Sequence, residues 1–334
     1  MTLQRVLGKG LDRLVLRTMG RFVGSMDYTL DRAEGETILA ESGLGDPSRF
    51  FPSLPPLTDH ELSTRLIEER PLYSVSEFRL RSPVQDALPP NDLMTVRRFR
   101  PRRHRRGRVI VLHGAMVRSR FPWDRMARQL AERDIEALVP SMPDHFERTP
   151  AGEYSGQYLL GGHLGRGPQL IRQGVTDVRA LVRLLRSEGD EPIGIVGFSM
   201  GGLIGGWTIT PEPLDFAVLA EPAVELAPIV YETDLGEVAR RSLGQSGWAA
   251  EDAARWLKAL SPVSAYPLLP PDRLLLVLPE HDCFVPPHAV ERAWELWGRP
   301  DMERYPAGHI SLFILRRPWR DILVFAERWC PPRD

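Results

Sequence analysis

Apolar and polar residues change their pattern along the chain at about residue 107. From there onward, short apolar runs alternate with stretches whose apolar residues recur at helical spacing. The predicted strands are residues 109–112, 135–139, 195–197, 216–220, 274–278 and 302–305, and the predicted helices are residues 122–133, 169–186 and 318–329. Continuous apolar strands are typical of a sheet covered on both faces. The pattern therefore predicts an α/β fold with a mostly parallel central sheet and helices on both faces.

Two segments upstream of residue 107 alternate apolar with polar residues instead. We expect residues 76–80 and 94–99 to form half-exposed antiparallel strands at one edge of the sheet. The basic run at residues 102–108 contains no aromatic residue and leads directly into a strand. We therefore interpret it as a solvated turn and not as a nucleic-acid site.

The first seventy residues show a third pattern. Residues 3–23 place apolar side chains at helical spacing and a basic residue at every fourth position, so they predict an amphipathic helix. We expect this helix to dock on the main domain; the alternative is a basic helix on an anionic membrane surface or a partner. Residues 44–59, rich in Pro, Gly and Ser, predict a loop. We divide the chain into an N-terminal helical extension (1–70) and an α/β domain (71–334).

Two long segments interrupt the alternation of strands and helices, at about residues 141–168 and 222–262. Both follow the carboxyl ends of predicted strands, where open α/β sheets build their binding sites. We therefore expect helical cap insertions that cover a pocket.

Composition narrows the class of protein. The formal net charge of −1 gives no overall attraction to nucleic acid. The two cysteines, Cys283 and Cys330, argue against a disulfide framework and suit a reducing cytosol. No apolar run reaches the roughly 18 residues of a membrane span. No signal peptide is readable, so we expect a cytoplasmic protein.

Residues 197–202 read Gly-Phe-Ser-Met-Gly-Gly and fit the Gly-x-Ser-x-Gly nucleophile elbow. A serine on this sharp turn is pushed out of the sheet, and the flanking glycines remove side chains that would clash. Serine becomes a nucleophile only when a histidine accepts its proton and an acid orients that histidine. Asp282 and His309 follow Ser199 in the expected chain order, each just after a predicted strand.

The acid has two further candidates. Glu221 follows the strand after the elbow, and Glu280 lies two residues before Asp282. We favour Asp282, with Glu221 and Glu280 as alternatives.

The chemistry also needs two backbone donors for an oxyanion. One is expected to be the amide of Met200, directly after the nucleophile. The other is expected in the His-Gly-Ala-Met loop, residues 113–116, which follows the strand at 109–112. We favour the Ala115 amide over that of Met116, and we interpret His113 as a structural residue at the strand end.

From about residue 75 onward, this set of motifs resembles the α/β-hydrolase superfamily. Softer motifs at residues 143–150, 296–298 and 308–311 are similar to a narrower group, the bacterial proteins related to the α/β-hydrolase-domain-18 family. The resemblance implies the α/β-hydrolase fold and a serine hydrolase that acts on esters or amides. There are two departures. Pro279 stands where the superfamily often has glycine, and the Gly-Ala-Met loop differs from the Gly-Gly-Gly form of some wide-pocket esterases.

We expect hydrolysis of a carboxylic ester, either lipid-like or with a small acyl group, through an acyl-enzyme and without a cofactor. His145, His163 and His281 lack the paired spacing of a zinc motif, so we expect no metal. The alternative hypothesis is a catalytically silent protein of this fold that binds a membrane or partner through residues 3–23.

Overall fold

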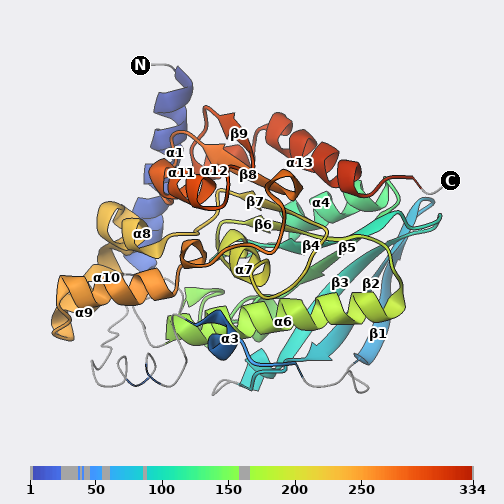
Figure 1. The fold of residues 1–334 in the computed structure, drawn as a ribbon, viewed down its shortest axis with the longest axis horizontal. Coiled ribbons are helices and arrows are strands. Elements are labelled where there is room, and N and C mark those ends of the chain that lie inside the picture. Colours follow the sequence, from blue (N-terminus) through green and yellow to red (C-terminus); the bar gives the residue numbers. More distant parts are fainter. Residues whose placement is uncertain are drawn as a thin grey trace.

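The computed structural model describes residues 3–23, 46–54, 61–85, 89–157 and 166–332, together with Thr37 and Ala40. Within these residues nine strands form one sheet, in the order β1-β2-β3-β5-β4-β6-β7-β8-β9 (Figure 1). The strands are β1 (Glu61–Glu69), β2 (Tyr73–Arg81), β3 (Leu93–Pro101), β4 (Gly107–Leu112), β5 (Ile135–Pro140), β6 (Ile193–Phe198), β7 (Phe216–Ala220), β8 (Leu274–Pro279) and β9 (Asp301–Tyr305). The α-helices are α1 (Leu3–Val23), α3 (Pro47–Phe50), α4 (Phe121–Ala131), α6 (Arg166–Glu188), α7 (Met200–Thr208), α8 (Leu226–Glu232), α9 (Glu237–Gln245), α10 (Ala250–Ala259), α11 (Pro287–Leu296), α12 (His309–Leu312) and α13 (Arg316–Trp329).

The sheet has an antiparallel part and a parallel part. The pairs β1–β2, β2–β3 and β3–β5 are antiparallel, and every pair from β5 across to β9 is parallel. Every residue of β4, β5, β6, β7 and β8 is buried, which explains their nearly uninterrupted apolar sequences. The mostly parallel central sheet predicted from the sequence is confirmed.

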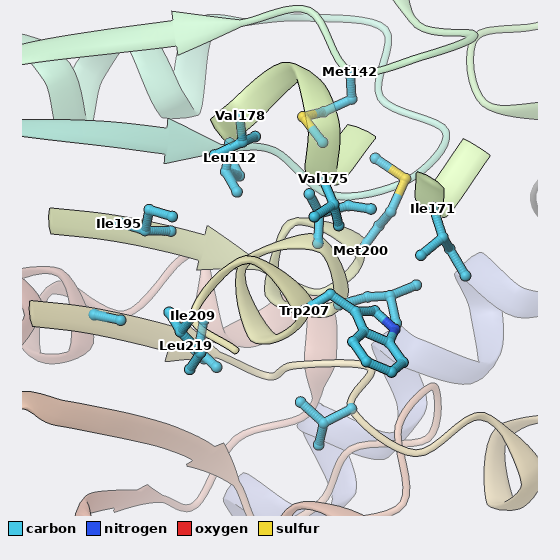
Figure 2. Packing of buried hydrophobic residues seen from close by; sticks show 14 of the residues in the cluster. Leu112, Met142, Ile171, Val175, Val178, Ile195, Met200, Trp207, Ile209 and Leu219 are labelled. Atoms are coloured by element: carbon cyan, nitrogen blue, oxygen red, sulfur yellow. The ribbon is translucent and has the colours of Figure 1, made fainter. Parts of the chain in front are cut away.

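Helices cover both faces of this sheet, as predicted. On one face α6 and α7 pack against Leu112, Ile195 and Leu219 of three parallel strands, as Figure 2 shows. On the other face α4 and α13 contribute Trp123 and Phe325 to a second buried cluster. Burying each face removes apolar side chains from water, the dominant favourable term in folding. This packing on both faces fixes the carboxyl ends of the parallel strands relative to one another.

The N-terminal region agrees with the prediction in one part and departs from it in another. The helix expected at residues 3–23 is α1, and it packs against α12 and the 3-10 turn Asp234–Gly236. The helical extension predicted for residues 1–70 is wrong at its end, because β1 pairs with β2 at the edge of the main sheet. As a domain boundary, the division at residue 70 stays a prediction. Within the loop expected at 44–59, the described residues include α3.

The two expected cap segments follow β5 and β7. Residues 222–262 hold α8, α9 and α10, as the sequence indicated. Of the segment at 141–168, residues 158–165, including His163, lie outside the described residues. No helix in the described ranges is long and apolar enough to cross a bilayer.

Candidate active site

Ser199 lies on the tight turn between β6 and α7, with φ 53° and ψ −109°. This left-handed conformation costs free energy for a residue with a side chain and is held by the surrounding structure. A Cβ on Gly197 would lie 2.3 Å from the Gly201 carbonyl oxygen, and one on Gly201 would lie 2.3 Å from that of Leu112. Both positions therefore require glycine, because strand and helix approach each other backbone to backbone.

Three side chains from distant parts of the chain meet above this turn. His309 Nε2 lies 3.0 Å from Ser199 Oγ, and His309 Nδ1 lies 2.7 Å from Asp282 Oδ2. The second oxygen of Asp282 accepts hydrogen bonds from the amides of Phe284 and Val285, at 2.7 and 2.8 Å. The Asp282 carboxylate thus accepts a hydrogen bond from Nδ1–H of His309, which leaves Nε2 free to accept a proton from the serine hydroxyl.

The surroundings of His309 tune its proton affinity. The ring stacks on Phe284 with centroids 4.7 Å apart, and the residue is buried. Burial alone would lower the pKa of His309. The neighbouring Asp282 carboxylate is the largest opposing effect, and the pKa is raised to about 9. Such a histidine is a strong base once it has lost its proton.

The alternative acids lie in different environments. Glu221 Oε2 is 3.9 Å from His309 Nδ1, too far for a hydrogen bond. Glu221 is fully buried, and neither of its carboxyl oxygens has a hydrogen-bond partner among the described residues. Its burial raises the pKa of Glu221 well above the ordinary value, which favours the neutral acid. Glu280 is exposed, unlike the buried pair of Asp282 and His309.

Two buried histidines stabilise the loop of residues 113–116, which was predicted to supply the second oxyanion donor. The Met116 amide donates to His145 Nε2 at 3.2 Å, so it is already engaged. His113 accepts a hydrogen bond from the Met142 amide through Nε2 at 3.1 Å, in keeping with a structural role. Burial lowers the pKa of both histidines, that of His145 to about 4, so both stay neutral.

The expected oxyanion donors have no such engagement. Within the described residues, the amides of Ala115 and Met200 donate none of the hydrogen bonds found in the protein. Both residues line the same cavity as Ser199. Both amides are therefore available as hydrogen-bond donors in the described part of the chain, and their role as oxyanion donors stays a prediction.

A cavity of about 960 Å³ opens from Ser199 and His309. Its walls come from α1, α6 and the helices of residues 222–262, and they are mostly apolar. The apolar side chains farther along these walls include Val15, Met19, Ile171, Ile229, Val230 and Trp256. An apolar cavity of this size can enclose an apolar group next to the serine.

Three groups of this site are of types that also bind metal ions. Ligand atoms of Glu221, Asp282 and His309 all lie within 4.8 Å of one another. The His309 nitrogen in this group is the one that already donates to Asp282. The set therefore fits an acid–base chain better than three free ligands, and the absence of a cofactor or metal stays a prediction.

Comparison with known proteins gives relatives in sequence and in structure. No protein-family model matches the chain. The uncharacterised protein Rv2627c of Mycobacterium tuberculosis is 28% identical over 233 residues, which cover 66% of this chain and 54% of that protein. The chain thus spans about half the length of this relative. The lipase LipV of the same organism is 34% identical over 122 residues, 36% of this chain and 38% of LipV.

A solved structure extends the likeness over nearly the whole chain. The acetyl xylan esterase from Paenibacillus sp. R4 superposes with a TM-score of 0.61 at 16% identity, covering 91% of this chain and 98% of that protein. At this identity the likeness concerns the fold alone, and the narrower resemblance to the α/β-hydrolase-domain-18 group stays a prediction. The strand order, the helices on both faces and this superposition together show that the chain has the α/β-hydrolase fold.

Proposed function

We propose that this protein is a serine hydrolase that cleaves a carboxylic ester, with Ser199 as nucleophile, His309 as general base and Asp282 as the acid that orients it. The unbroken chain of hydrogen bonds from Ser199 Oγ through His309 to Asp282, opening into a cavity, carries this proposal. The names of the lipase and of the acetyl xylan esterase add support for an ester over an amide.

The proposed reaction uses each group once in each half. Ser199 Oγ attacks the ester carbonyl carbon while its proton passes to His309 Nε2. The amides of Ala115 and Met200 hold the oxyanion until the C–O bond breaks, and the leaving alcohol takes the proton from His309. Water then attacks the acyl-enzyme with His309 again as base, and the acid product leaves with Ser199 restored.

The acyl group is proposed to be apolar. The cavity beside Ser199, with a volume of about 960 Å³, is large enough to bury several methylene groups, each worth about 0.8 kcal/mol when removed from water. Among p-nitrophenyl esters we expect kcat/KM to rise at least about tenfold from acetate to octanoate. A preference for acetate would contradict the apolar acyl group and leave ester hydrolysis standing.

A fluorophosphonate probe tests the nucleophile directly. We expect the wild-type protein to be labelled and to hydrolyse esters, and Ser199→Ala to lose both. Ser155→Ala is the matched control, because Ser155 lines the same cavity and should keep labelling and activity. An unlabelled, folded wild-type protein, or equal labelling of Ser199→Ala, would contradict the proposal.

Membrane contact through residues 3–23 is a second candidate role, compatible with the first. Helix α1 docks through Gly8, Asp12 and Leu16, yet Leu7 and Leu14 are each 62% exposed. An exposed apolar patch on a basic helix suits an anionic lipid surface. We expect wild-type protein to co-sediment with phosphatidylserine vesicles and Leu7→Glu/Leu14→Glu to do so less. Equal sedimentation of the two proteins would remove this role.

A further inference from the structure

We infer that Asp12, in the N-terminal helix α1, is a positioning residue for His309, so that α1 is a part of the catalytic apparatus. This inference rests on the proposed function. Asp12 is the one acidic residue between positions 3 and 23, and it is fully buried. A buried carboxylate in a basic helix needs a structural reason, since removing a charge from water is costly.

The Asp12 carboxylate ties together the two loops that carry the acid and the histidine. Its Oδ2 accepts hydrogen bonds from the amides of Cys283 at 3.0 Å and His309 at 2.8 Å. Its Oδ1 accepts one from the amide of Ile310 at 3.0 Å. Cys283 directly follows Asp282. One side chain thus fixes the backbone at both ends of the Asp282–His309 hydrogen bond.

Close packing of α1 makes these hydrogen bonds geometrically available. A Cβ on Gly308 would lie 2.6 Å from Asp12 Oδ2 and 2.7 Å from the Gly8 carbonyl oxygen. A Cβ on Gly8 would lie 2.7 Å from the Gly308 amide nitrogen. The helix and the histidine loop therefore meet where both chains have glycine.

Loss of Asp12 would leave three amides without their partner. The amides of His309 and Ile310 belong to the first turn of α12, where no earlier helical carbonyl accepts them. Buried amides that lose their acceptor pull the backbone toward another partner. The His309 ring would then shift relative to Ser199 Oγ, from which it is now 3.0 Å away.

Asp12 is expected to act through the backbone, because its three hydrogen bonds come from the backbone amides of Cys283, His309 and Ile310. The substrate cavity is therefore expected to keep its affinity when Asp12 changes. A displaced base lowers the rate of the chemical step while leaving binding nearly unchanged.

The test compares kcat per active serine, counted by fluorophosphonate titration, in the full-length protein. We expect Asp12→Ala to lower kcat about 100-fold with KM within about threefold, as for a displacement of about 1 Å. Asp12→Asn keeps one acceptor oxygen and should lose about tenfold, so it gives a partial rescue. Arg13→Ala, the exposed neighbour on α1, is the matched control and should keep wild-type kcat.

The outcomes separate this inference from the proposed function. A purely structural role would reduce the number of serines that can be titrated and leave kcat per titrated serine unchanged, which would overturn the inference. If Asp12→Ala does not fold, the Asp12→Asn protein decides: wild-type kcat per serine overturns the inference. If the wild-type protein itself is not labelled, the proposed function fails first, and with it the inference.

Discussion

Two fully buried glutamates of the same sheet have opposite surroundings. Glu136 lies near the amino end of β5, and Glu221 directly follows the carboxyl end of β7. Glu136 accepts hydrogen bonds from Arg98 at 2.8 and 3.1 Å, from Arg100 at 3.0 Å and from Arg105 at 2.9 Å. Glu221 has no hydrogen-bond partner among the described residues, and the imidazole of His309 is 3.9 Å away.

The same burial therefore gives two different protonation states. Burial would raise the pKa of Glu136, but its arginine partners outweigh that effect and hold the pKa below the ordinary value. With no such partners, burial raises the pKa of Glu221 well above the ordinary value. A buried carboxyl group stays charged where hydrogen-bonded cations surround it and becomes neutral where they do not. An ion network thus surrounds Glu136 near the amino end of β5, whereas Glu221 at the carboxyl end of β7 is a buried neutral acid.

The largest effect is expected at Asp282, whose carboxylate is hydrogen-bonded to the His309 nitrogen that Glu221 also faces. Asp282→Asn keeps the shape of the side chain. The amides of Phe284 and Val285 hold its one remaining oxygen, so an NH2 group faces His309 Nδ1 in place of the acceptor that fixes the proton there. If the proposed triad is correct, we expect kcat for an ester to fall about 10⁴-fold, as in serine hydrolases that lose this acid. The measurement is kcat per folded protein, with circular dichroism to confirm folding. A loss below about 100-fold would mean that Glu221 takes over as the acid.

The next largest effect is expected when the carboxylate of Glu136 is removed from the ion network. Glu136→Ala leaves the buried guanidinium of Arg108 and the half-buried one of Arg105 with fewer acidic partners. We expect the free energy of unfolding, measured in urea, to fall by about 3 kcal/mol, and kcat of the folded protein to stay unchanged. The control is Glu237→Ala, which removes an exposed ion pair with Arg241 and should cost less than about 1 kcal/mol. Equal losses in the two variants would mean that the network around Glu136 contributes no more than a surface pair.

Sequence patterns were sufficient for the parts of this fold whose burial is regular. β4 to β8 are buried along their whole length, so their apolar runs are visible without the structure. The pattern did not predict β1, because Leu66 and Ile67 are exposed at 59% and 41% and none of the side chains described for it, at residues 64–69, is buried. Edge strands of this kind are defined by hydrogen bonds to their neighbour.

The same limit applies to the site. Ser199, Asp282 and His309 each follow a strand in a fixed order, so spacing alone pointed to them. Asp12 contacts Cys283 and His309 across 271 and 297 residues. An acid in a basic amphipathic helix is typical of a solvent-exposed position. Only tertiary packing shows that this acid is buried.

The smallest expected effect gives the sharpest test of the two glutamates. His309 acts as a base only after losing its proton, and the Asp282 carboxylate raises the pKa of His309 above its ordinary value. We therefore expect kcat/KM of the wild-type protein to keep rising above pH 7. Glu221→Gln replaces one neutral group by another. The rising limb of the pH profile of kcat/KM should therefore stay within about half a pH unit, and kcat at pH 9 within about threefold, of the wild-type values.

A charged Glu221 would give a different result. Glu221 raises the pKa of His309 only when it carries a negative charge, so removing that charge would move the limb to lower pH by about one unit or more. Such a shift would show that Glu221 is ionised, like Glu136, in spite of its missing partners. Glu280→Gln is the control, because its exposed carboxyl group lies two residues before Asp282 and should leave the limb in place. The charge of Glu221 is set by its burial without hydrogen-bonded cations. The pH profile of Glu221→Gln tests whether that burial keeps Glu221 neutral.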